Sequence, residues 1–225
     1  MDFLMDKDLY LFDFDGTIIN TAPSVQAAIN YMRRKYGLPE FTLKEAETLI
    51  GRGQDYTINM AIADGNGIVY EKAEALYQRY YEQNPAKNSC IYPGITKLLQ
   101  RLKGEHKTMG IISNKYSYLI KSILDSFGYG SYFSLICGPD IVGAKKPEPN
   151  MVFYSMERIG VPLDRIILIG DSVYDVQTGK NAGITTAFVT HGYGSYDDVV
   201  REQPDYLLTG NRVLSFLKYN KNMGG

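Results

Sequence analysis

The sequence predicts an α/β fold with a parallel sheet and a helical bundle inserted after the first strand. From about residue 91 onward, short and continuously apolar runs alternate with helical patterns. This alternation is typical of a parallel sheet that is covered by helices on both faces. Residues 21–83, by contrast, have helical periodicity almost throughout and contain no good strand.

The helical segment directly follows the first apolar run. Apolar residues recur at helical spacing over 25–36, with Pro23 in the first turn. Thr42 and Glu45 form a capping-box pattern that predicts a second helix ending at Gly51. A third amphipathic stripe covers residues 73–80. Three tyrosines in and next to this stripe are expected to pack within the bundle: Tyr77, Tyr80 and Tyr81.

The apolar runs predict six strands, separated by helices. Helices are expected after Pro93, over residues 116–127 and near residues 151–159. The last four residues, 222–225, are expected to be a frayed tail. The six strands are predicted at residues 9–12, 108–112, 133–137, 165–169, 185–189 and, more weakly, 206–208.

Composition excludes several classes of protein. The 225 residues carry 24 basic and 25 acidic side chains with no basic run, which argues against nucleic acid as a partner. No apolar run approaches the roughly 18 residues that span a bilayer, and the acidic start lacks a secretory signal. Cys90 and Cys137 are isolated and lack metal-binding spacing. We therefore expect a cytoplasmic protein. A monomer and a homodimer both remain open.

Two carboxylates lie close together where the first apolar run ends. Leu9–Phe12 reads as a buried strand, and Asp13 and Asp15 follow it directly. Side chains at positions i and i+2 of an extended segment point the same way, and Gly16 then allows a sharp turn. Two like charges this close are unfavourable unless a cation lies between them or one carries a proton.

Polar residues also follow other predicted strands. Ser113 and Asn114 come after the second run, and Asp171 and Asp175 come after residues 165–169. Lys146 stands just before a predicted helix. Because ligands bind beyond the carboxyl ends of parallel strands, we expect these groups to converge at one edge of the sheet.

These residue types suit phosphoryl chemistry. Asp13, Asp15 and Asp171 offer the hard oxygen ligands that Mg²⁺ prefers. Ser113 and Asn114 can bind phosphoryl oxygens, and the ammonium group of Lys146 can neutralise a phosphorylated aspartate. Ordinary structural roles remain open: a helix cap for the Ser–Asn pair, a helix N-terminal pair for Asp171 and Asp175, and a solvated loop for Lys146.

The chain resembles the haloacid dehalogenase superfamily of phosphatases over nearly its full length. Four motifs stand in the order of that family: residues 13–17, 113–114, 146–149 and 170–175. Residues 20–23, 92–94 and 113–115 look most like the phosphoglycolate phosphatase branch. The resemblance implies a Rossmann-like three-layer core at residues 1–20 and 85–225, and a mobile helical cap domain at residues 21–84.

The resemblance also implies a role for each motif residue. Asp13 would attack phosphorus, and Asp15 would act as general acid and then as general base. The carboxylates of Asp13 and Asp171 and the backbone carbonyl of Asp15 would hold Mg²⁺, with Asp175 in a supporting position. Lys146 would neutralise charge on Asp13 and the phosphate. The phosphoryl oxygens would be bound by Thr17, Ser113 and Asn114.

Several polar residues lie outside the four motifs. Arg52, flanked by two glycines, is equally consistent with a cap arginine that contacts substrate and with an exposed surface arginine. Asn20 stands where many relatives carry Asp, and we expect it to alter hydrogen bonding at the cap hinge. Lys145 is expected in solvent, and His106 and His191 receive no role.

The sequence thus predicts a Mg²⁺-dependent phosphatase of a small phosphorylated metabolite, with an aspartyl-phosphate intermediate. Phosphoglycolate, pyrophosphate, a nucleotide and a sugar phosphate remain open as substrates. A phosphomutase or pyrophosphatase of the same fold is the main alternative. A dehalogenase is disfavoured by Asp15, and a phospho-accepting signalling protein is disfavoured by the helical insertion.

Overall fold

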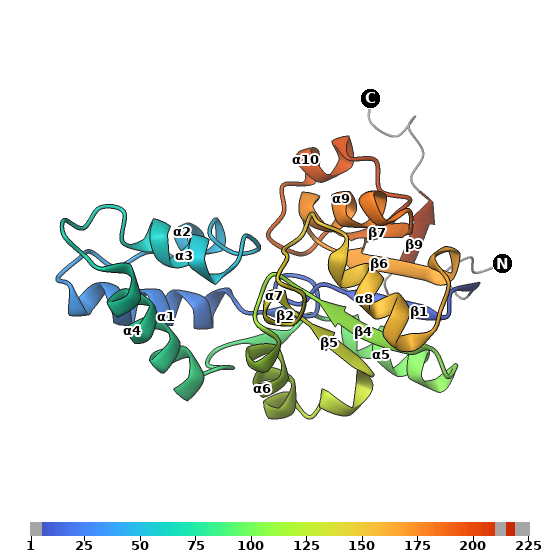
Figure 1. The fold of residues 1–225 in the computed structure, drawn as a ribbon, viewed down its shortest axis with the longest axis horizontal. Helices are drawn as coiled ribbons and strands as arrows, with labels where there is room; N and C mark the ends of the chain where they lie inside the picture. Colours follow the sequence, from blue (N-terminus) through green and yellow to red (C-terminus); the bar gives the residue numbers. More distant parts are fainter. Residues whose placement is uncertain (1–5, 210–214, 219–225) are drawn as a thin grey trace.

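The computed structural model describes residues 6–209 and the backbone of residues 215–218. The predicted tail at 222–225 lies outside the described residues. Within them, a mostly parallel sheet is covered by helices on both faces, which confirms the predicted fold class (Figure 1). Among the described helices, none combines the length and apolar surface that a bilayer crossing requires.

The central sheet has the order β5-β4-β1-β6-β7-β8-β9. The first six strands in this order are parallel, and β9, which was not predicted, pairs antiparallel with β8 at the edge. The bounds are β1 Leu9–Phe12, β4 Thr108–Ile112, β5 Leu135–Cys137, β6 Ile166–Gly170, β7 Thr185–Val189, β8 Tyr206–Thr209 and β9 Ser215–Lys218. β5 begins two residues later than predicted because the backbone N–H of Phe133 still donates to Gly130 in a preceding 3₁₀ turn.

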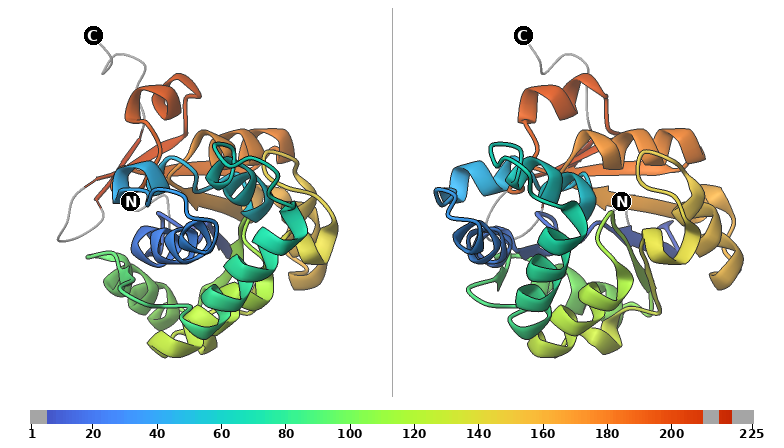
Figure 2. Two further views of the ribbon diagram at one scale, coloured as in Figure 1. Left: turned by 90° about the vertical axis from the view of Figure 1, so that its left-hand side faces the viewer. Right: turned by 60° about the vertical axis from the view of Figure 1, so that its left-hand side comes forward.

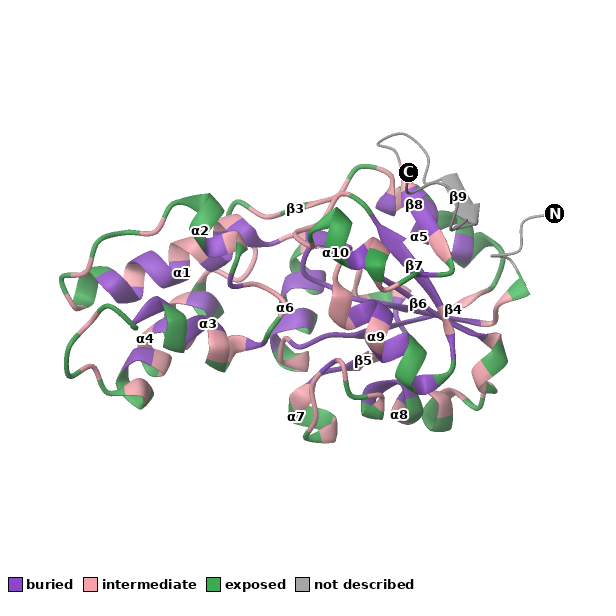
Figure 3. Cartoon of the chain, turned by 90° about the horizontal axis from the view of Figure 1, so that it is seen from above, coloured by how far each residue is buried: buried purple, intermediate pink, exposed green. Residues whose placement is uncertain are grey.

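Alternation along β1 explains the two helical layers. Tyr10 and Phe12 face one way, into the core with α5 (Ile95–Gly104) and α6 (Ser117–Phe127). Leu9 and Leu11 face the other way, towards α8 (Asn150–Ile159) and α9 (Val173–Ala182). Figure 2 shows helices on either side of the sheet. All four side chains of β1 are fully buried, and Figure 3 shows the central strands as the buried interior of the molecule. Two short helices complete the core: α7 Pro139–Val142 and α10 Tyr196–Arg201.

The insertion after β1 contains four helices and lies to one side of the sheet (Figure 1). They are α1 Ala22–Lys35, α2 Leu43–Glu47, α3 Gln54–Ala61 and α4 Tyr70–Gln83. The chain enters through β2 (Ile19–Asn20) and leaves through β3 (Cys90–Ile91), which form an antiparallel pair. That this insertion moves as a separate cap domain with bounds 21–84 stays a prediction.

Within the insertion, the second predicted helix is shorter than expected. The capping box of Thr42 and Glu45 is present, but α2 ends at Glu47. The next residues form tight turns, in which the N–H groups of Leu49 and Ile50 donate to carbonyls three residues back. α3 was not predicted as a separate element. It begins after Gly53, whose φ of 95° is accessible mainly to glycine.

A buried arginine organises the interior of the insertion. The Arg33 side chain is 1% exposed, and its guanidinium group donates to both carboxylate oxygens of Asp64 at 2.8 and 2.7 Å. It also donates to the backbone carbonyls of Pro39 and Ala61, and it lies 4.1 Å from the centre of the Phe41 ring. The planar donor fork of Arg33 therefore connects α1 to the end of α3 and to the loops that carry Pro39 and Asp64.

We predict that Arg33→Lys lowers the free energy of unfolding by about 2–4 kcal/mol, because a lysine cannot reproduce the bidentate pair and leaves buried carbonyls without a donor. Arg34→Lys is the matched control. The Arg34–Glu40 pair is about half exposed at both ends, so the change should cost less than about 0.5 kcal/mol. Urea unfolding measures both, and equal effects would contradict the organising role of Arg33.

Candidate active site

The candidate site lies where the strand order reverses. From β1 the chain crosses to β4 and β5 on one side, whereas β6, β7 and β8 lie on the other. Such a switch point leaves a crevice beyond the carboxyl ends of the strands. A cavity of ≈ 210 Å³ lies here, between the sheet and the helical insertion. Its lining includes Asp13, Asp15, Arg52, Ser113, Asn114, Lys146 and Asp171.

Asp13 directly follows β1 and is paired with Lys146. Their closest atoms, Lys146 Nζ and Asp13 Oδ1, are 2.7 Å apart, and both residues are 5% exposed. Lys146 Nζ also lies 2.5 Å from Asp175 Oδ1. Burial, together with Asp175 and Asp15, raises the pKa of Asp13 to about 6, although Lys146 opposes the shift. Asp13 is thus a buried carboxylate whose charge depends on nearby cations.

Asp171 follows β6 and faces the same space. Thr17 Oγ1 donates to its Oδ1 at 2.9 Å, and the backbone N–H of Tyr193 donates to its Oδ2 at 2.8 Å. Burial, with Asp13 and Asp175 nearby, raises the pKa of Asp171 to about 8. The two carboxylates at the ends of β1 and β6 therefore resist being ionised together.

The described residues include one group of carboxylates that fits a metal ion. Ligand oxygens of Asp13, Asp171 and Asp175 lie within 4.8 Å of one another, and all three residues are buried. Carboxylate oxygens are suitable donors for a hard divalent cation. Both oxygens of Asp175 are already used, by Lys146 and by Ser172 at the start of α9. Asp13 and Asp171 are therefore the more available ligands.

Gly16 makes this close approach possible. Its φ of 89° lies in the left-handed region. A Cβ atom at this position would lie 2.5 Å from Asp171 Oδ2 and 2.8 Å from Cδ2 of Tyr193. Only glycine therefore allows the turn after β1 to pack directly against the Asp171 carboxylate.

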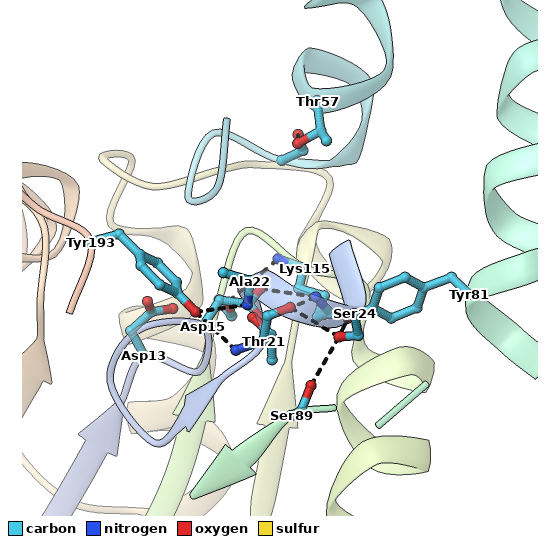
Figure 4. A network of polar contacts seen from close by, with 12 residues as sticks. Asp13, Asp15, Thr21, Ala22, Ser24, Thr57, Tyr81, Ser89, Lys115 and Tyr193 are labelled. Carbon is cyan, nitrogen blue, oxygen red and sulfur yellow. Dashed lines mark hydrogen bonds and ion pairs between the residues drawn. The ribbon is translucent and has the colours of Figure 1, made fainter. Parts of the chain in front are cut away.

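Asp15 has a different partner from Asp13. Lys115 Nζ lies 3.0 Å from both carboxylate oxygens of Asp15, and Thr21 Oγ1 donates to Oδ1 at 2.6 Å (Figure 4). The expected crowding of Asp13 and Asp15 is thus relieved by two separate lysines. Sequence reasoning gave Lys115 no role, although it directly follows the Ser113–Asn114 motif.

The three residues predicted to bind phosphoryl oxygens are placed differently from one another. The hydroxyl of Ser113 accepts from the N–H of Lys115, so its proton can be donated into the cavity. The amide of Asn114 instead holds the backbone of Lys146, accepting from its N–H at 2.7 Å and donating to its carbonyl at 3.2 Å. The hydroxyl of Thr17 is directed to Asp171, as described above. Their binding to phosphate stays a prediction.

Contacts also connect the insertion to the core across the cavity. Asn114 Nδ2 donates to the carbonyl of Gly51 at 2.9 Å. The Lys145 side chain, expected in solvent, is 38% exposed and also pairs with Asp55 of α3. The insertion therefore rests on the loops that follow β4 and β5.

Arg52, which was predicted as a candidate site residue, belongs to the insertion and lines the cavity. Its side chain is exposed, and its guanidinium group lies over the Tyr56 ring and donates to the Tyr56 hydroxyl at 2.9 Å. Tyr77 and Tyr81 also line the cavity, besides packing against each other. Two of the three tyrosines that were expected to pack within the bundle thus also form part of the cavity wall.

Tyr193 is a second residue that sequence reasoning missed. Its hydroxyl accepts from the N–H groups of Thr21 and Ala22 at 2.8 and 2.9 Å, and it donates to Asn20 Oδ1 at 2.9 Å. Asn20 therefore does take part in the hydrogen bonds at the entry to the insertion. The signal was available, because residues 190–194 follow the apolar run of β7 just as the predicted motifs follow their strands.

Comparison with known sequences agrees with this geometry. The sequence profile described as haloacid dehalogenase-like hydrolase matches residues 10–189. The matched segment covers the described site residues from Asp13 to Asp175. The chain belongs to this hydrolase family. The resemblance predicted from the four motifs is thereby confirmed.

Similar curated proteins of the family are phosphoglycolate phosphatases. The protein from Pseudomonas savastanoi pv. phaseolicola is 30% identical over 212 residues, which cover 92% of this chain and 78% of that protein. The protein from Aquifex aeolicus is 31% identical over 199 residues, covering 88% of this chain and 91% of its own length.

Solved structures share the fold. A protein from Haemophilus somnus 129PT, described as a predicted phosphoglycolate phosphatase, has a TM-score of 0.83 at 25% identity, covering 90% of this chain and 93% of its own. CbbY from Rhodobacter sphaeroides, solved in complex with phosphate, has a TM-score of 0.77 at 20% identity and covers 90% and 93% of the two chains. The Rossmann-like core of the hydrolase family is therefore common to all of them.

We predict that Mg²⁺ stabilises this hydrolase more strongly as the pH rises. Without a cation, the pKa values of Asp13 and Asp171 are raised in the folded state above their ordinary 3.8. The stability that the two protonated carboxyl groups contribute is therefore fully present below about pH 4. It is lost as the pH rises through their folded-state pKa values of about 6 and about 8. A bound cation favours the ionised carboxylates, so its effect grows over the same range.

Thermal unfolding with and without MgCl₂ between pH 5 and 8.5 measures this. The gain in Tm should increase with pH in the native chain and disappear in Asp171→Asn. The exposed residue Asp164 provides the control, since Asp164→Asn should keep the gain. A gain that is the same at all pH values would contradict the assignment of these carboxylates to a cation site.

Proposed function

We propose that the protein is a Mg²⁺-dependent phosphatase that hydrolyses a small phosphomonoester through an aspartyl phosphate on Asp13. The observation that carries this is the arrangement around Asp13. A buried carboxylate lies 2.7 Å from a lysine and shares a possible cation site with Asp171, while Asp15 stands apart with a separate partner. The nucleophile and the acid/base catalyst would therefore be two different side chains, those of Asp13 and Asp15.

In the first half of the reaction, an Asp13 oxygen would attack phosphorus as the bond to the alcohol oxygen breaks. Lys146 would balance the charge that Asp13 carries with the phosphoryl group, and the Ser113 hydroxyl would donate to a phosphoryl oxygen. Asp15 would give a proton to the departing alcohol. Asp13 and Asp171 would hold Mg²⁺, which would supply stabilisation of the negative charge on the phosphoryl group.

In the second half, water would attack phosphorus on the opposite side from Asp13. Asp15, now ionised, would accept a proton from that water, and the bond between phosphorus and the Asp13 oxygen would break. The electron pair returns to the Asp13 carboxylate, which restores the pair with Lys146. Phosphate is the product.

We infer that the substrate is a phosphoglycolate-type metabolite. The similar curated proteins are phosphoglycolate phosphatases, and the cavity of ≈ 210 Å³ is smaller than the roughly 300–1,000 Å³ typical of sites for drug-sized ligands. The helical insertion would act as the cap that closes over this ligand and excludes water. We also propose that the partner is a small phosphorylated metabolite and that the protein is cytoplasmic.

We predict that the protein releases p-nitrophenolate from p-nitrophenyl phosphate when Mg²⁺ is present, and that Asp13→Asn abolishes the activity. An amide cannot form the acyl phosphate, so kcat should fall by at least about 10³-fold. Asp8→Asn provides the control, because Asp8 lies before β1 and pairs with Arg165, away from the cavity. Comparable turnover in Asp13→Asn protein would exclude Asp13 as the nucleophile.

We predict that Arg52→Ala raises KM for phosphoglycolate while leaving p-nitrophenyl phosphate hydrolysis nearly unchanged. A carboxylate on the leaving group can bind a guanidinium group, whereas nitrophenol offers no such charge. The loss of one charged hydrogen bond corresponds to roughly a tenfold increase or more in KM. An unchanged KM for phosphoglycolate would make Arg52 a surface residue.

The same assays separate the alternatives. A phosphomutase would return the phosphoryl group to a sugar phosphate and give an isomer in place of free phosphate. A pyrophosphatase would prefer pyrophosphate over phosphoglycolate. A panel of phosphorylated metabolites, assayed for phosphate release, therefore distinguishes these activities.

A further inference from the structure

Lys115 lies at the contact between the core and the insertion. It follows β4 in the loop before α6, and Figure 4 shows its side chain with that of Asp15 next to the start of α1. The side chains of Lys115 and Asp15 are each 10% exposed. Burial is the largest single effect and lowers the pKa of the Lys115 ammonium group, but Asp15, Tyr81 and Tyr77 together outweigh it and raise that pKa. Lys115 is thus a largely buried cation that none of the steps above uses.

Lys115 restricts the orientation of the Asp15 carboxylate. Its ammonium nitrogen is 3.0 Å from each oxygen, and Thr21 donates to one of them at 2.6 Å. A carboxylate held through both oxygens cannot rotate freely. Because a general base must lie within hydrogen-bond distance of the proton that it accepts, this fixed orientation matters for Asp15.

The other side of the ammonium group faces the insertion. Lys115 Nζ lies 4.8 Å from the centre of the Tyr81 ring in α4, and Tyr81 is 1% exposed. The Tyr81 hydroxyl lies 3.4 Å from Ser24 Oγ in α1. The position of Lys115 therefore depends on an aromatic ring that belongs to the inserted helices.

We propose that Lys115 is a positioning residue for Asp15, which it aligns as the general base only when α4 of the insertion is seated on the core. This proposal rests on the proposed phosphatase function. Lys115 does not exchange a proton. It holds the Asp15 carboxylate in the orientation from which an oxygen can accept a proton from water, when water cleaves the bond between phosphorus and Asp13.

The proposal predicts which half of the reaction suffers in Lys115→Met. Release of p-nitrophenolate needs no protonation, so formation of the aspartyl phosphate should continue at its normal rate. Hydrolysis of the intermediate should slow by on the order of tenfold to hundredfold, because Asp15 is no longer aligned. We therefore expect kcat and KM to fall together, with kcat/KM nearly unchanged, and a burst of about one p-nitrophenolate per active site.

Two further variants test whether Lys115 acts through Asp15. Asp15→Asn should show the same burst, and the double variant should be no slower than Asp15→Asn alone, because Lys115 then has nothing left to align. Lys115→Arg should recover most of the turnover, since a guanidinium group can also donate to both oxygens of a carboxylate. Lys121→Met is the matched control, because Lys121 is exposed on α6 and should behave as the native chain.

Tyr81→Leu tests the contribution of the insertion. This variant should release a burst of p-nitrophenolate, as Lys115→Met does, but with a smaller amplitude. Thermal unfolding checks that the variant is folded. Full turnover in folded Tyr81→Leu protein would remove the insertion from the proposal.

The outcomes separate the proposal from the function on which it rests. If the native chain hydrolyses p-nitrophenyl phosphate but Lys115→Met loses kcat/KM as strongly as kcat, without a burst, the positioning role is wrong and the phosphatase stands. If the losses in kcat of Lys115→Met and Asp15→Asn add up in the double variant, the positioning role is likewise wrong and the phosphatase stands. If the native chain shows no turnover with any phosphomonoester, the proposed function fails, and this inference fails with it.

Discussion

Charge balance in a nearly dry space is the constraint on which the rest of the site depends. Four carboxylates and two ammonium groups, each at most about 10% exposed, are gathered beyond the carboxyl ends of β1, β4 and β6. The carboxylates exceed the ammonium groups by two charges, which one divalent cation would neutralise. Because unpaired buried charge is strongly unfavourable, the loop that carries Lys146 has to place its ammonium group next to Asp13 and Asp175. The residues concerned are Asp13, Asp15, Asp171, Asp175, Lys115 and Lys146.

The order of the strands determines how these charges are distributed. β1 lies between β4 and β6, so the carboxylate of Asp13 faces Asp171 from one neighbour, and Asp15 faces Lys115 from the other. The two aspartates are only two residues apart, yet their surroundings differ. This difference allows one to act as a nucleophile beside a cation while the other serves in proton transfer.

Much of this could be predicted from the sequence. Continuous apolar runs located the strands, and the polar residues after them located the site, because parallel strands bring their ends to one edge. Lys115 and Tyr193 each follow a predicted strand, but their partners could not be predicted, for a physical reason. Their roles depend on contacts with Asp15 and with residues 20–22, and no local periodicity reports contacts between segments about 100 and 170 residues apart. The end of α2 and the separate helix α3 were also missed, because the tight turns over residues 48–52 resemble continued helix in sequence.

The narrow connection between core and insertion has an evolutionary consequence. Both chain crossings pass through the two-residue strands β2 and β3, and the hydroxyls of Ser24 and Ser89 meet at 2.9 Å beside them. The register of the main sheet involves no residue between these crossings. The inserted helices can therefore be lengthened, shortened or exchanged as one unit. The strands that carry the reactive groups keep their alignment when this happens. Selectivity for the leaving group can thus diverge among descendants that retain the same phosphoryl chemistry.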